Sequence, residues 1–167
     1  MSKTPYSLAP FKEGHDRTLF RSGSEQLDRY LREQVTQDIR RRVAACFVAL
    51  EGRERIIGYY TLASAGVPLT SLPPERRKKL PRYLSVPTVR MGRLAVDQAF
   101  QGIGLGGALL ADAIDRTMRS GIAAYALIVD AKCDDAAAFY RHHGFIALPD
   151  TPLVLFLPFA SIRAFSL

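Results

Sequence analysis

A glycine-rich turn constrains the fold of this chain more than any other feature of its sequence. The turn, Gln101-Gly-Ile-Gly-Leu-Gly-Gly107, follows a β-rich run at 88–96 and precedes apolar residues at helical spacing. Glycines let the backbone approach a ligand and leave several N–H groups pointing at one place, at the positive end of the following helix. The turn therefore predicts a site for an anionic group such as a pyrophosphate.

The same glycines also match a dinucleotide-binding pattern, which the rest of the chain argues against. Gly102, Gly104 and Gly107 satisfy G-x-G-x-x-G. Only about 60 residues follow the turn, and five residues separate the preceding strand from the first glycine, so a doubly wound sheet does not fit. No Gly-Lys-Ser/Thr follows either, which excludes a Walker A loop. A purely structural turn is the remaining alternative.

The hydrophobic pattern predicts a mixed α/β domain with a mostly antiparallel central sheet flanked by helices. Ser24 is a suitable N-cap for the first helix, and Gly121 a suitable C-cap for the third. We expect helices at 24–42, 74–80, 105–121 and 134–143, and strands at 43–50, 56–63, 88–96, 124–131 and 153–157.

Length and composition exclude several classes of protein. The chain has 167 residues, 48% of them hydrophobic and 23% charged, which predicts one globular domain over residues 1–167. No apolar run reaches the length of a membrane-spanning helix, and no secretory leader is visible. Cys46 and Cys133 form neither a disulfide framework nor a metal-binding spacing. We therefore expect a cytoplasmic protein without metal and without membrane contact.

The net charge of +7 is concentrated in one stretch, residues 76–93, called here the basic segment. It carries seven basic residues and no acidic one; the other 16 basic residues equal the 16 acidic ones. Arginine side chains suit phosphate recognition, and a solvated surface is the alternative. The candidate nucleic-acid-binding residues are Arg77, Lys78, Lys79, Arg82, Arg90 and Arg93.

Two motifs in this order resemble the signatures of the GNAT N-acetyltransferases. Gln101-x-x-Gly104-x-Gly106 is similar to Q/R-x-x-G-x-G/A, and Ala136-Ala-Ala-Phe-Tyr140-Arg-His-His-Gly144-Phe145 is similar to A-x-x-x-Y-x-x-x-G-F. The resemblance covers residues 88–146. It implies the GNAT acyltransferase fold and acetyl-CoA as the acetyl donor.

The resemblance also implies roles for individual residues. The turn amides would hold the pyrophosphate of acetyl-CoA, the strand before the turn would pair with the pantetheine arm, and Tyr140 would be the general acid for the CoA thiolate. A half-buried core tyrosine is the alternative for Tyr140. Cys133 stands where the family often has Asn. The cofactor-binding residues implied are Leu94, Ala95, Val96, Gln101, Gly102, Ile103, Gly104, Leu105, Gly106, Cys133, Ala136 and Phe139.

One departure from the family pattern concerns the acceptor. Many members carry a carboxylate on the strand before the turn, whereas the charged residues at 89–96 are all arginines. A lysine acceptor needs a base, because its pKa is about 10.4, whereas an α-amine with a pKa near 8 is already largely neutral. The sequence therefore favours an α-amine acceptor, or a water relay.

A narrower resemblance covers the whole chain. The early helix, the Ile57-Gly-Tyr-Tyr-Thr-Leu62 strand and the Arg90-x-Gly-Arg-Leu-Ala-Val-Asp97 run resemble the acetyltransferase toxins of bacterial type II toxin–antitoxin modules, the TacT and AtaT class. It implies acetylation of the α-amine of aminoacyl-tRNA, whose phosphates would meet the basic segment, and inhibition of translation.

The same resemblance implies a ribbon-helix-helix antitoxin, repression of the shared operon through antitoxin-bound operator DNA, and a homodimer. Two alternatives stay open. One is a GNAT enzyme for a small-molecule amine, a peptide N-terminus or a protein lysine; the other is a non-catalytic RNA-binding GNAT module.

Overall fold

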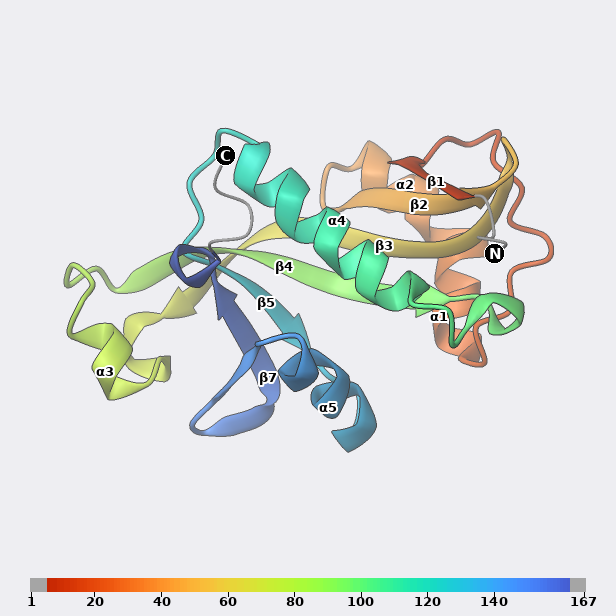
Figure 1. Cartoon of the computed structure of the whole chain (residues 1–167). Coiled ribbons are helices and arrows are strands. Elements are labelled where there is room, and N and C mark those ends of the chain that lie inside the picture. The colour runs from red at the N-terminus through yellow and green to blue at the C-terminus, as the bar shows by residue number, and fades with distance from the viewer. Residues whose placement is uncertain (1–5, 163–167) are drawn as a thin grey trace. The chain divides into compact units, whose positions relative to one another are not determined.

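The computed structural model describes residues 6–162 (Figure 1). The strands are β1 (Tyr6–Pro10), β2 (Ala45–Glu51), β3 (Arg55–Pro68), β4 (Ser85–Val96), β5 (Ala126–Asp130), β6 (Ile146–Leu148) and β7 (Thr151–Pro158). The helices are α1 (Glu25–Arg29), a π-helical segment (Tyr30–Gln34), α2 (Val35–Arg40), α3 (Pro74–Arg77), α4 (Leu105–Arg119) and α5 (Asp134–His142).

The seven strands hydrogen-bond in the order β1-β2-β3-β4-β5-β7-β6. The pairs β1–β2, β2–β3, β5–β7 and β6–β7 are antiparallel, whereas β4 and β5 run parallel from Thr88 opposite Ala126 to Met91 opposite Val129. The predicted mixed α/β fold with a mostly antiparallel sheet is confirmed. The five predicted strands are all present, but the short edge strands β1 and β6 were not predicted.

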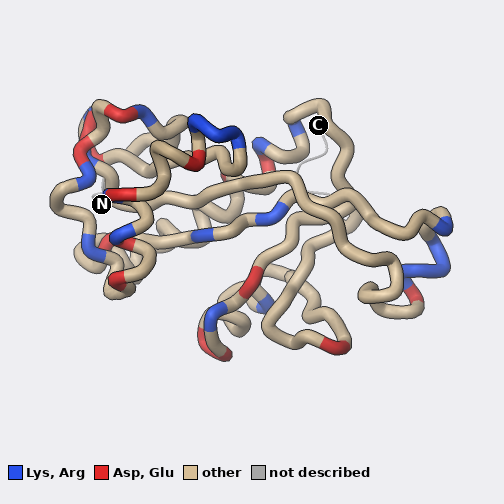
Figure 2. The backbone as a smooth tube through the Cα atoms, turned by 180° about the vertical axis from the view of Figure 1, so that it is seen from behind, with Lys and Arg blue, Asp and Glu red and all other residues tan. Residues whose placement is uncertain are grey.

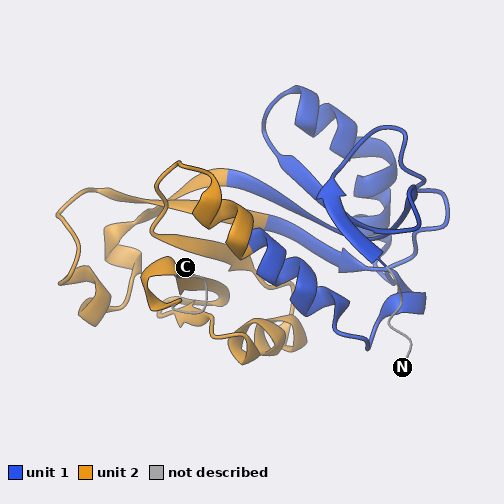
Figure 3. Ribbon diagram, turned by 45° about the horizontal axis from the view of Figure 1, so that its top comes forward, with its two compact units in different colours: residues 1–63, 92–113 blue, residues 64–91, 114–167 orange. Residues whose placement is uncertain are grey.

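The chain divides into two compact units (Figure 3). Unit 1 comprises residues 1–63 and 92–113, and unit 2 comprises residues 64–91 and 114–167. Three elements, β3, β4 and α4, begin in one unit and end in the other. The single domain over residues 1–167 stays a prediction.

In unit 1 the first helix packs its apolar side against β2 and β3. Ser24 caps it as predicted, because its hydroxyl accepts a hydrogen bond from the Leu27 amide at 3.3 Å. The Tyr59 hydroxyl of β3 donates to the Leu27 carbonyl at 2.7 Å. The helix changes to π geometry at Tyr30–Gln34, a change that the sequence pattern did not predict.

In unit 2 an apolar cluster holds the segment between β3 and β4. Its buried members include Leu72, Val86 and Ile128, and the partly buried Leu69 and Leu80 pack against it. The predicted helix at 74–80 is shorter than expected, since α3 ends at Arg77 and gives way to turns before Pro81. The loop that carries the basic residues is therefore anchored by apolar side chains.

Between residues 6 and 162, no helix has the length and apolar character needed to cross a membrane.

Candidate functional site

The glycine-rich turn of unit 1 has the backbone geometry that the sequence predicted. Gly102 and Gly104 adopt φ angles of 80° and 85°, in the left-handed region that other residues rarely enter. α4 begins at the next residue, Leu105, and the Ala108 amide donates to the Gly104 carbonyl at 3.0 Å. A Cβ at Gly102 or Gly104 would meet nothing within 4 Å, so a ligand can approach the backbone. The turn can therefore hold an anionic group at the N-terminus of a 15-residue helix.

Side chains on both sides of the turn hold it in place. Asp97 is buried, and its carboxylate accepts hydrogen bonds from the amides of Ala99 at 2.9 Å and Arg21 at 3.0 Å. The Gln101 side chain donates to the carbonyls of Val96 at 2.9 Å and Ser22 at 3.0 Å. The signature glutamine thus fixes the turn with its side chain, and only its backbone faces a ligand. Sequence reasoning missed the contribution of residues 21–22, which no motif marks.

The strand before the turn carries the residues predicted to pair with the pantetheine arm. Ala95 is buried in the core of unit 1, whereas Leu94 and Val96 are partly buried. The parallel register of β4 with β5 ends at Met91, before these residues. Of the turn residues, Gln101 to Gly104 are exposed, Leu105 is buried and Gly106 is partly buried.

Tyr140 lies on α5 in unit 2 with its ring in an apolar setting. Tyr140 is 8% exposed, and its ring packs beside Phe139 and Phe145, with centroids 5.3 and 5.4 Å away. Burial raises the pKa of the Tyr140 phenol to about 12, and the negative charge of Asp130 adds to this shift. Within the described part of the chain, the hydroxyl has no hydrogen-bond partner and is not fully covered. Tyr140 therefore holds its proton at neutral pH and can donate a hydrogen bond to a ligand.

Protonation alone does not make the transfer to a thiolate favourable. The pKa of a free thiol, about 8.5, is lower than that of a tyrosine phenol, about 10. Full transfer from Tyr140 to a released thiolate is therefore uphill. The phenol can act as a hydrogen-bond donor that stabilises negative charge on sulfur while the bond to sulfur breaks.

The other predicted cofactor residues of unit 2 lie at the start of α5. Cys133 is exposed at the N-cap position, with extended backbone and no side-chain capping bond. Ala136 and Phe139 are partly buried on the same helix as Tyr140.

One carboxylate near Tyr140 was missed by sequence reasoning. Asp130 ends β5, forms an ion pair with Arg90 of β4, and is close enough for its charge to affect the Tyr140 phenol. The carboxylate missing from the sequence pattern concerned the strand before the turn, whereas Asp130 lies at the end of β5. The signal available was an aspartate at the end of the predicted strand 124–131.

The structure distributes the predicted nucleic-acid-binding residues over several places. Arg77, Lys78 and Arg82 line one pocket in unit 2, and Lys79 is exposed beside it. Figure 2 shows these basic residues along the loop that carries α3. Arg90 is paired with Asp130, and the Arg93 guanidinium of unit 1 lies over the Tyr30 ring, 3.5 Å from its centroid.

Within the described residues, His, Cys, Asp and Glu form no group of three that could hold a metal ion.

Comparison with known proteins identifies the family. The profile of the acetyltransferase (GNAT) family matches residues 10–145. This chain belongs to that family. As a GNAT acetyltransferase it uses acetyl-CoA as the donor of an acetyl group to an amine, in agreement with the open turn at the helix N-terminus.

This GNAT acetyltransferase is similar over nearly its whole length to bacterial toxins. It is 38% identical over 154 residues to a tRNA-acetylating toxin of Mycobacterium tuberculosis (strain ATCC 25618 / H37Rv), covering 91% of each chain. A solved structure of KacT with a tyrosine-to-phenylalanine mutation matches with a TM-score of 0.89 and 30% identity, covering 96% of this chain and 99% of KacT. AtaT complexed with acetyl-methionyl-tRNAfMet matches with a TM-score of 0.88 and 27% identity, covering 96% and 98%.

Further matching structures, 26–28% identical, show the same toxins with other molecules. They are AtaTR bound with acetyl-CoA, AtaT bound to the C-terminus of the antitoxin AtaR, and a KacTA–DNA complex.

Proposed function

We propose that this GNAT acetyltransferase is a toxin that acetylates the α-amino group of aminoacyl-tRNA and thereby blocks translation. The observation that carries the proposal is the 38% identity to a tRNA-acetylating toxin across 91% of both chains. The similarity to AtaT, solved with acetyl-methionyl-tRNA, supports the same substrate class. The basic side chains of the α3 loop agree with it, because they suit a polyanionic substrate.

The proposed chemistry is a direct transfer. The neutral α-amine attacks the acetyl carbonyl of acetyl-CoA, the C–N bond forms, the C–S bond breaks to release the CoA thiolate, and the proton that the amine loses passes to water. Tyr140 donates a hydrogen bond to the sulfur as it becomes a thiolate, a role supported by its unpaired, protonated hydroxyl. The amides of the turn from Gln101 to Gly106 would bind the pyrophosphate, and Leu94 to Val96 would bind the pantetheine arm.

The acceptor class follows from the proton balance. An α-amino group has a pKa near 8, and a neighbouring ester carbonyl lowers it further, so much of it is neutral at cellular pH. Such an amine attacks without a strong base. This agrees with a β4 strand whose charged residues are Arg90 and Arg93 alone.

The partners of the toxin belong to the same proposal. A ribbon-helix-helix antitoxin would bind this chain and repress the shared operon by holding operator DNA, and two copies of this chain would form a homodimer. Complexes of AtaT with the C-terminus of AtaR and of KacTA with DNA support an antitoxin and a DNA contact through it.

The test is acetyl transfer from labelled acetyl-CoA to total tRNA. One pool is aminoacylated, and the matched control is the same pool after mild alkaline deacylation, which removes the amine and keeps the RNA. We expect label only in the charged pool. Label in neither pool, with acetyl-CoA demonstrably bound, would refute the proposal and favour a small-molecule, peptide or lysine amine as acceptor.

A further inference from the structure

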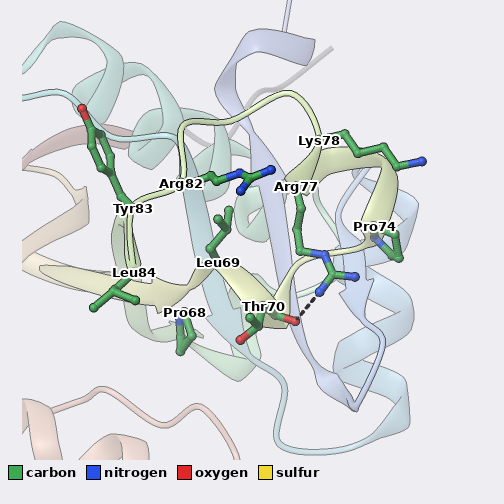
Figure 4. A pocket seen from close by; sticks show the side chains of 9 residues that line it. All are labelled: Pro68, Leu69, Thr70, Pro74, Arg77, Lys78, Arg82, Tyr83 and Leu84. Carbon is green, nitrogen blue, oxygen red and sulfur yellow. Dashed lines mark hydrogen bonds between the residues drawn. The ribbon is translucent and has the colours of Figure 1, made fainter.

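A pocket of about 690 Å³ lies in unit 2 between the end of β3 and the start of β4 (Figure 4). Pro68, Leu69 and Leu84 supply an apolar side. Arg77, Lys78 and Arg82 supply the charge, and Figure 4 shows the Arg82 side chain extending toward the α3 turn. The volume is within the range of pockets that bind small organic groups.

The three cations of the pocket lack anionic partners within the described chain. None of them forms a salt bridge there, and Arg77 donates only to the Thr70 carbonyl, at 3.4 Å. Arg90, in contrast, is paired with Asp130. Three like charges around one pocket repel one another, so an anion that enters it is stabilised.

The rim of the pocket exposes large apolar side chains beside these cations. The Tyr83 side chain is 68% exposed and Leu84 is 94% exposed. In Figure 4 the Tyr83 ring points outward from the pocket, away from the side chains of Arg82 and Arg77. An exposed aromatic ring at the rim of a basic pocket is a combination that binds single-stranded nucleic acid, because bases stack on the ring and phosphates meet the cations. A phosphate backbone alone needs no apolar pocket. The pair of features therefore indicates a nucleotide whose base is unpaired.

The position of the pocket within unit 2 decides which nucleotide it can reach. Leu84 directly precedes β4, and six residues further along is Arg90, whose partner Asp130 precedes the helix of Tyr140. At about 3.3 Å per residue, the pocket lies roughly 20 Å from this ion pair. The occupant is therefore several nucleotides away from the one that carries the reacting amine.

We propose that the pocket at residues 68–84 binds an unpaired nucleotide near the 3′ end of the aminoacyl-tRNA, with Tyr83 as the stacking surface and Arg77 and Arg82 as phosphate ligands. The proposal rests on the proposed function, because it assumes a tRNA substrate. The pocket is anchored by Leu69 and Leu80 in the core of unit 2, so it is a formed site. By the spacing above it lies roughly 20 Å from the Arg90–Asp130 ion pair, so it acts on substrate binding.

The first experiment measures binding by fluorescence anisotropy of a 3′-terminal ACCA tetranucleotide with a 5′ fluorophore, titrated with the full chain. Stacking of one base predicts that Tyr83→Ala weakens binding about 5- to 150-fold, whereas Tyr83→Phe keeps it within about twofold. Tyr83 is exposed, so both variants retain the fold. Tyr6→Ala, which removes an exposed tyrosine of β1, is the matched control and leaves binding unchanged.

The charge component has its own control. Arg77→Gln/Arg82→Gln should reduce the slope of log K against log salt concentration by about 1.4, since each phosphate contact contributes roughly 0.7 on a single strand. Arg41→Gln/Arg53→Gln removes the same charge from two exposed residues of unit 1 that do not line the pocket. An equal loss in both double variants, with Tyr83→Ala binding like wild type, overturns the pocket proposal.

A second experiment separates this proposal from the proposed function. With charged tRNA as acceptor, Tyr83→Ala should raise KM for tRNA while kcat and KM for acetyl-CoA stay unchanged. If wild type labels charged tRNA and Tyr83→Ala has the same KM, the pocket proposal is refuted and the proposed function stands. If wild type labels no tRNA, the proposed function is refuted, and the anisotropy experiment alone decides whether the pocket binds a nucleotide.

The remaining outcome concerns a different occupant. A 12-residue peptide of alternating Glu and Leu also matches cations beside apolar groups. If it displaces ACCA and binds wild type more tightly, and Tyr83→Ala loses this binding, the pocket is a protein-docking site and the nucleotide proposal is overturned.

Discussion

Replacing Tyr140 by phenylalanine tests the role of one hydroxyl with little change to the fold. The ring stays between Phe139 and Phe145, and no hydrogen bond within the described chain is lost. We expect the free energy of unfolding to change by less than about 1 kcal/mol, because a lost hydrogen bond is the main source of larger effects. Any loss of turnover is then a loss of chemistry.

The size of that loss follows from the Tyr140 pKa. A phenol with a pKa of about 12 is a weaker acid than a thiol by about 3.5 units, so full proton transfer is uphill by about 5 kcal/mol. The contribution left is a hydrogen bond to a developing charge, about 1.5–3 kcal/mol. At 1.36 kcal/mol per factor of ten, kcat should fall about 10- to 150-fold in Tyr140→Phe, with KM for acetyl-CoA nearly unchanged.

The assay is the initial rate of label transfer to charged tRNA, alongside urea unfolding of the same preparations. Tyr125→Phe, which alters a partly buried tyrosine elsewhere in unit 2, is the matched control and should keep wild-type kcat. A folded Tyr140→Phe variant with unchanged kcat refutes the assigned role. A raised KM with normal kcat means that the hydroxyl binds the donor and takes no part in the chemical step.

Three further predictions concern the fold and the turn. Gly58→Ala should lower the free energy of unfolding by about 1–3 kcal/mol in urea titrations, because the new Cβ would lie 2.9 Å from Leu109 Cδ1; an unchanged midpoint would contradict this. Gly104→Ala, at φ 85° in open space, should cost about 1–2 kcal/mol of backbone strain and weaken acetyl-CoA binding in calorimetry, whereas wild-type affinity would show that the turn geometry is dispensable. Burial raises the pKa of the Cys46 thiol from 9.0 to about 12, so folding favours its neutral form. This contribution, at most about 4 kcal/mol, is complete below pH 9 and is lost as pH rises toward 12. Cys46→Val should therefore flatten the decline of the free energy of unfolding in urea titrations at pH 8–11, and an equally steep decline in the variant would contradict this.

The ion pair between Arg90 and Asp130 links a predicted nucleic-acid-binding residue to the surroundings of the predicted catalytic residue Tyr140. Arg90 was predicted to bind nucleic acid, yet its guanidinium is engaged by a carboxylate that also acts on Tyr140. Arg93 is likewise held over Tyr30. The α3 loop of unit 2, by contrast, carries cations free to meet a polyanion, since Arg77, Lys78 and Arg82 have no such partners among the described residues.

The sequence by itself determined the features that depend on local geometry. Positive φ angles at Gly102 and Gly104, the cap at Ser24 and the span of α5 each depend on residue type and near neighbours, which a linear pattern records. The two family motifs work in the same way, because each lies within ten residues on one turn or one helix.

Only the tertiary structure decided which distant residues meet. The strands β1 and β6 are short edge strands held by a single neighbour each, so their own residues carry little periodic signal. Asp130 acts on Tyr140, and Tyr83 borders a pocket with Arg77, because of how β4, β5 and the α3 loop pack within unit 2. Contacts of this kind depend on strand register and on apolar anchoring of a loop, which are properties of the folded chain and of no single segment.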